Sequence, residues 1–177
     1  MNSGNDYLAD GNYTKALDEF IKAYNIDSSN ANINFKVGYC YLFHPKQKHL
    51  AEKFLERATK DATIDYNEEN PMFKKAPVDA YLLYGEALHL DYKFDEALKM
   101  YDLYTSHLDK TKFKEEIAEV DHFKTTVNNA RTRVAKPAKI LVTDMGDSIN
   151  SEFPEYSPLL SADERMMIFT YRGNRVT

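Results

Sequence analysis

The chain has 177 residues, 43% of them hydrophobic, which is enough for one sizeable core and at most one small further unit. Its 23 Lys and Arg against 28 Asp and Glu give a formal net charge of -5, and this disfavours a nucleic-acid-binding protein, which must neutralise phosphates. The single cysteine, Cys40, excludes an internal disulfide, and no apolar run reaches the roughly 18 residues that a membrane-spanning helix needs.

One spacing of small and large residues recurs three times in residues 1–112. In each copy a glycine comes first, an alanine lies further along the chain, and a large side chain comes four residues after that alanine. The three sets are Gly4, Ala16 and Phe20; Gly38, Ala51 and Leu55; and Gly85, Ala97 and Tyr101. Gly4 and Gly38 lie 34 residues apart, and a fixed period of this length is typical of repeat proteins.

The period and its residue types resemble the tetratricopeptide repeat family. Residues 11–27, GNYTKALDEFIKAYNID, match the turn and second helix of that repeat, and residues 90–98 repeat the match. The resemblance implies two antiparallel helices per unit, with small residues where the helices approach closely and large ones filling the space between them. We therefore predict a mainly α chain, in which residues 1–112 form a helical solenoid of about three repeats.

An insertion is predicted between the second and third units. Gly38 and Gly85 are 47 residues apart, 13 more than the 34 that separate Gly4 from Gly38. We assign the surplus to residues 67–77, because two prolines and a polar cluster there disfavour a helix.

A longer helix is predicted to follow the third unit. Residues 114–135 carry apolar side chains at helical spacing and end before Pro137. These side chains are Ile117, Val120, Phe123, Val127, Ala130 and Val134. We interpret residues 113–136 as a capping helix, since a stacked array must cover its last apolar face.

The character of the chain changes at Pro137. Residues 138–143 and 166–171 are strand-like runs, and they are separated by the turn-rich segments 144–148 and 161–164. Residues 150–172 resemble part of a WD40-like propeller blade, which makes 161–164 a turn that links two strands. We therefore predict that residues 137–177 form a truncated first blade of a β-propeller.

The order of these pieces resembles the Bacteroidota proteins that combine tetratricopeptide repeats, a WD40-like propeller and a peptidoglycan-binding domain of the outer-membrane-protein-A type. The resemblance implies a periplasmic, outer-membrane-associated scaffold linked to type IX secretion. Peptidoglycan would then be bound only through a domain absent from this chain. We expect the parent protein to be longer in both directions.

The resemblance also implies a concave groove lined by the first helix of each unit. Counting by repeat position places nine residues there: Asn32, Phe35, Lys36, Tyr39, Phe43, Asp79, Leu82, Glu86 and His89. Aromatic and polar groups on a preformed concavity suit an extended or helical segment of a protein partner. Phe35 and Tyr39 have core packing as an equal alternative, and they occupy two positions of the family's carboxylate clamp, so no such clamp is expected.

Catalytic motifs are scarce. Two Glu-x-x-His pairs, Glu86 with His89 and Glu119 with His122, suggest a di-metal carboxylate enzyme completed by Glu52 or Glu56 and Glu96. The isolated pairs fit a repeat surface better. We therefore predict a non-enzymatic scaffold with no catalytic residues, metal or cofactor.

Two local features have simpler interpretations. Cys40 and His44 are spaced for a shared metal, but Cys40 stands where the repeat takes a small packing residue. Residues 144–148 are interpreted as a turn. A cytoplasmic repeat adaptor remains the alternative to the periplasmic scaffold.

Overall fold

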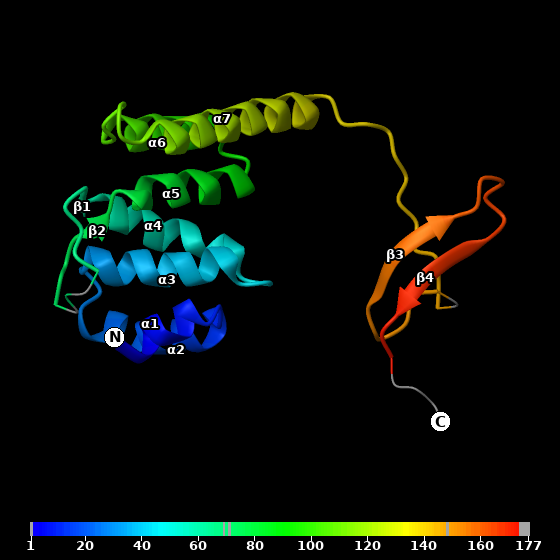
Figure 1. The fold of residues 1–177 in the computed structure, drawn as a ribbon, viewed down its shortest axis with the longest axis horizontal. Coiled ribbons are helices and arrows are strands. Elements are labelled where there is room, and N and C mark those ends of the chain that lie inside the picture. Colours follow the sequence, from blue (N-terminus) through cyan, green and yellow to red (C-terminus); the bar gives the residue numbers. More distant parts are fainter. Residues whose placement is uncertain (1, 69, 71, 148, 174–177) are drawn as a thin grey trace. The chain divides into compact units, whose positions relative to one another are not determined.

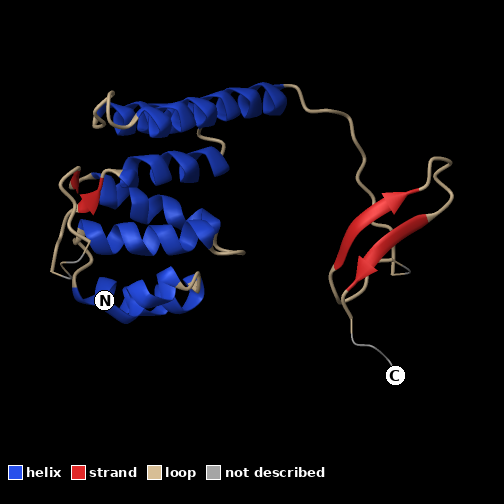
Figure 2. Cartoon of the chain, viewed as in Figure 1, coloured by secondary structure: helices blue, strands red, loops and turns tan. Residues whose placement is uncertain are grey.

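The chain is mainly helical and divides into two compact units. The computed structural model describes residues 2–68, 70, 72–147 and 149–173, and the units are Met1–Pro137 and Ala138–Thr177. All the helices of the described residues belong to the first unit (Figure 2). The predicted mainly α class is confirmed.

The first unit is built from helices that stack in chain order (Figure 1). They are α1 (Asn2–Ala9), α2 (Tyr13–Ile26), α3 (Ala31–Phe43), the 3-10 helix η1 (Lys48–Leu50), α4 (Ala51–Thr59), α5 (Asp79–Leu90), α6 (Phe94–Ser106) and α7 (Lys114–Ala135). Asparagine side chains cap the N-termini of α2 and α3: Asn12 accepts a hydrogen bond from the Lys15 amide, and Asn30 accepts one from the Ile33 amide. These bonds satisfy backbone donors that have no partner within the helix.

Each recurring glycine packs against the large side chain of the next helix. A Cβ placed on Gly4 would lie 2.6 Å from the Phe20 ring, and one on Gly38 would lie 2.6 Å from Leu55 Cγ. One on Gly85 would lie 2.5 Å from Tyr101 Cε1. Only a glycine allows these approaches, so the spacing found in the sequence corresponds to three contacts, α1 with α2, α3 with α4 and α5 with α6.

The apolar core runs through the stack in overlapping clusters. Phe20 and Leu55 are fully buried within the first four helices, and Tyr101, 1% exposed, lies in the cluster that joins α5, α6 and α7. Side chains from neighbouring helix pairs share these clusters, so each pair covers the apolar face of the next.

Helix α7 confirms the helix predicted at residues 114–135. Val120 and Val127 are buried against α5 and α6, whereas Val134 is 50% exposed, so the predicted apolar stripe packs over only part of its length. None of the helices in the described residues is both long and apolar enough to cross a membrane.

The insertion between α4 and α5 is anchored at both ends. β1 (Ala62–Thr63) pairs in parallel with β2 (Ala76–Pro77). The predicted irregular loop, residues 67–77, contains two positions, 69 and 71, that lie outside the described residues; the described remainder has no helix, and its only strand residues are Ala76 and Pro77.

The second unit contains one antiparallel pair of strands, β3 (Glu155–Leu160) and β4 (Met167–Tyr171). The strand predicted at 166–171 is confirmed, and residues 161–164 form the linking turn. The strand predicted at 138–143 is wrong: that segment is irregular, and Leu141 and Val142 are 86% and 88% exposed. An apolar β-branched run forms a strand only where another strand pairs with it.

Candidate peptide-binding groove

Helices α1, α3 and α5 line one cavity of about 430 Å³ together with the insertion. Four of the nine predicted groove residues contribute to it: Phe35, Lys36, Tyr39 and Asp79. Asn5, Leu8 and Ala9 of α1 and Tyr66, Glu68 and Pro77 of the insertion complete the lining. The three helices predicted to come first in each repeat therefore meet at this surface.

A row of aromatic rings runs along the exposed side of α3. Phe35, Tyr39 and Phe43 are four residues apart, and their ring centroids are separated by 6.3 and 4.7 Å. Tyr13, at the start of α2, stacks on Phe43 at 5.6 Å. Phe43 is 39% exposed, whereas Phe35 and Tyr39 are half-buried and also pack on the core. The row thus combines packing with an accessible aromatic surface.

Lys36 of α3 forms a hydrogen bond that links α3 to α1. Its Nζ donates to Asn5 Oδ1 at 2.7 Å and lies 5.6 Å from the centroid of the Phe20 ring. The side chain is only 4% exposed, and burial lowers the pKa of its ammonium. Lys36 therefore forms part of the cavity wall and does not present its ammonium openly to a ligand.

Asn32 supports the insertion instead of lining an open surface, which corrects the prediction for this residue. It is 1% exposed; its Nδ2 donates to the Phe73 carbonyl at 2.9 Å, and its Oδ1 accepts from the Tyr66 hydroxyl at 2.8 Å. These bonds place Tyr66 beside the groove, and burial raises the pKa of this phenol to about 12.

The predicted residues of α5 are divided among different environments. Asp79 is exposed at the start of the helix, and Leu82 is half-buried against the core cluster around Tyr101. Glu86 and His89 line a second cavity, of about 260 Å³, which Phe43 also reaches. Seven of the nine predicted groove residues therefore line one of two cavities, whereas Asn32 and Leu82 line neither of them.

Four residues at this surface were not among the nine predicted: Asn5, Tyr13, Tyr66 and Glu68. Asn5 lies on α1, the first helix of the first predicted repeat, whose groove positions were not counted, although the repeat register reaches it. Tyr13 lies on α2, a second helix, so the register of first helices carries no signal for it. Tyr66 and Glu68 lie on the insertion, which has no repeat position, so the register carries no signal for them.

The metal-ligand patterns do not converge. In the part of the chain that the structure describes, no three His, Cys, Asp or Glu side chains are grouped to hold a metal ion. Cys40 is fully buried, and burial raises the pKa of its thiol to about 12, while His44 Nδ1 accepts from the Lys46 amide. This pair therefore serves packing and helix termination.

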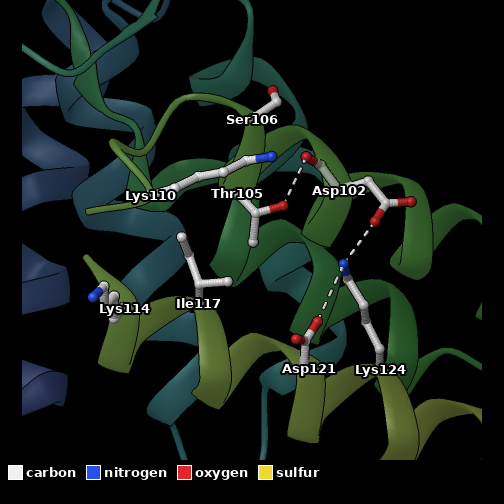
Figure 3. A pocket seen from close by; sticks show the side chains of 8 residues that line it. All are labelled: Asp102, Thr105, Ser106, Lys110, Lys114, Ile117, Asp121 and Lys124. Carbon is white, nitrogen blue, oxygen red and sulfur yellow. Dashed lines mark hydrogen bonds and ion pairs between the residues drawn. The ribbon is translucent and has the colours of Figure 1, made fainter. Parts of the chain in front are cut away.

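A separate surface cavity of about 500 Å³ lies between α6 and α7 (Figure 3). Lys124 of α7 reaches across it to Asp102 of α6 at 2.7 Å, and it lies 3.7 Å from Asp121 on its own helix. The Thr105 hydroxyl donates to the backbone carbonyl of Asp102. Lys124, Asp102 and Thr105 thus interact with one another across the cavity wall.

Comparison of the chain with known protein families and with curated protein sequences finds no match.

Proposed function

We propose that residues 1–112 form a tetratricopeptide solenoid that acts as a non-enzymatic scaffold by binding a segment of a partner protein. The aromatic row of α3 carries this proposal, because it lies on the surface shared by α1, α3 and α5. The three glycine contacts between paired helices support the repeat assignment. Half-buried aromatic rings on a rigid concavity give affinity with little ordering cost.

We extend the proposal to a larger protein. In it, α7 caps the solenoid, and β3 and β4 belong to a WD40-like propeller blade of a periplasmic, outer-membrane-associated protein linked to type IX secretion. Exposed apolar residues on the strands, such as Leu159 at 70% and Ile168 at 62%, support this, because the neighbouring blades of a propeller would cover this face of the sheet.

Replacement of Tyr39 by Ala tests the groove. Peptides selected from a random library on the full chain should bind the variant at least tenfold more weakly, since a central aromatic contact commonly contributes about 1–2 kcal/mol or more. Leu103→Ala, on the exposed side of α6, is the matched control and should bind normally. Circular dichroism checks that both variants fold. Peptides that bind Tyr39→Ala with unchanged affinity would refute the groove.

The genomic reading frame on both sides of these codons tests the larger architecture. We expect an export signal with a lipidated cysteine upstream, and further blades with a peptidoglycan-binding domain downstream. A start codon at Met1 and a stop codon after Thr177 would instead favour the small cytoplasmic adaptor.

A further inference from the structure

The second cavity has aromatic walls and one carboxylate. It lies between the end of α3, η1, α5, α6 and α7, with Phe43, Tyr101 and Phe123 among its lining residues. The Tyr101 and Phe123 ring centroids are 6.0 Å apart, with their planes tilted by 32°. Because Phe43 also ends the aromatic row of α3, this cavity continues the proposed groove.

Glu86 brings an uncompensated negative charge to this cavity. The side chain is half-buried, and within the described residues it makes no hydrogen bond or ion pair. Burial raises the pKa of Glu86, and the Glu119 carboxylate on α7 raises it further. A carboxylate in this setting gains from a cationic partner that restores the interactions it has lost with water.

The other charged groups around the cavity do not supply that partner. Lys48 on η1 is exposed and lowers the pKa of Glu86 only as the smallest of three influences. Burial lowers the pKa of His89, which favours the neutral form of this imidazole. Glu119 adds a second negative charge, and the surroundings of Glu86 therefore favour a cation from outside the chain.

We propose that this cavity binds the side chain of an arginine residue in the partner segment. The planar guanidinium donates two parallel hydrogen bonds to one carboxylate, here that of Glu86, and its flat face stacks on aromatic rings such as Phe43 and Phe123. Lysine offers a single point charge and no flat face, so it satisfies these walls less completely. This inference rests on the proposed peptide-binding function and adds the chemistry that the segment must carry.

The test uses two small probes, N-acetyl-arginine amide and its neutral isostere N-acetyl-citrulline amide. Each is titrated into the isotopically labelled full chain, and binding is followed by the NMR signals of backbone amides in α5 and α7. We expect the arginine probe to bind at least tenfold more tightly than the citrulline probe. Equal binding of the two probes, or perturbation of amides remote from this cavity, would overturn the arginine site.

Three variants make the test specific. Glu86→Gln should abolish the preference for arginine, and Lys48→Ala should strengthen arginine binding severalfold, because the Lys48 ammonium repels the probe. Asp18→Asn removes one exposed carboxylate from α2 and should change nothing. A preference for arginine that survives Glu86→Gln contradicts the proposal, and so does weaker binding by Lys48→Ala.

The outcomes separate this inference from the groove itself. Library peptides that require Tyr39 while neither probe is preferred would refute the arginine site and leave the groove. Arginine binding that requires Glu86, combined with peptides indifferent to Tyr39→Ala, would refute the peptide groove and leave a guanidinium site.

Discussion

Tyr101→Ala is expected to lower the free energy of unfolding of the full chain by about 3–5 kcal/mol, as removal of a large buried aromatic side chain does. Tyr101 is 1% exposed and packs α6 against both Gly85 of α5 and Phe123 of α7. Its loss leaves a cavity where three helices meet. Such a loss is a large share of the roughly 5–15 kcal/mol that stabilises a typical domain, and urea unfolding followed by circular dichroism measures it.

Two variants control for other causes. Tyr101→Phe keeps the ring and should cost less than about 1.5 kcal/mol. Leu103→Ala, on the same helix but 41% exposed, should cost less than about 1 kcal/mol. A Tyr101→Ala cost no greater than that of Leu103→Ala would show that Tyr101 does not join the helices as described.

The close approach at Gly85 makes a further prediction: the effect of Gly85→Ala on stability should change sign when Tyr101 is replaced. Gly85→Ala alone should destabilise by about 1–3 kcal/mol, because the new Cβ would lie 2.5 Å from Tyr101 Cε1. In the Tyr101→Ala background that obstacle is gone, and the better helix propensity of alanine, about 1 kcal/mol, should make the same change neutral or stabilising. An equal cost in both backgrounds would contradict the contact.

The helix pairing could be predicted because the residues that make the contacts between paired helices recur at a fixed spacing in the sequence. Gly4 with Phe20, Gly38 with Leu55 and Gly85 with Tyr101 are each one contact between consecutive helices. Such local contacts depend on residue types only 16 or 17 positions apart. The same register predicted that Tyr39 and Asp79 belong to one surface, and both line the first cavity.

Asn32 could not be placed correctly, because its partners are remote in the sequence. It bonds to Tyr66 and Phe73, 34 and 41 residues away, on an insertion that the repeat does not describe. Its register position implied a groove residue, but the insertion covers it.

For the strands, the residue types alone were misleading. Residues 138–143 have the apolar β-branched character of a strand but no partner, whereas β3 contains Pro158 and still pairs with β4. Its register shifts between Tyr156 and Leu159, and Ser157 adopts a φ of 51° there. A bulge of this kind accommodates a proline that a regular central strand would exclude.

Alkaline conditions are expected to destabilise the fold through Cys40. Burial raises the pKa of the folded thiol from the ordinary value of 9.0 to about 12, so between these values the unfolded chain holds fewer protons than the folded chain. Stability is therefore complete below pH 9 and is lost progressively from pH 9 to pH 12. At pH 10 the loss from this thiol alone is about 1.4 kcal/mol.

Cys40→Ala isolates this contribution, because alanine is the residue at the equivalent position of the third unit, Ala87. Burial raises the pKa values of Tyr66 and Tyr104 to about 12, and these phenols lower the stability in the same way only above about pH 10. Burial lowers the pKa of Lys36, which therefore changes the stability in the opposite direction, and it does so in both proteins. Urea unfolding from pH 7 to pH 10 should therefore show the wild-type chain losing about 1.4 kcal/mol relative to Cys40→Ala. A difference between the two proteins that stays constant over this range would mean that the thiol ionises in the folded chain as readily as in the unfolded one, and that Cys40 is not sealed between α3 and its neighbours.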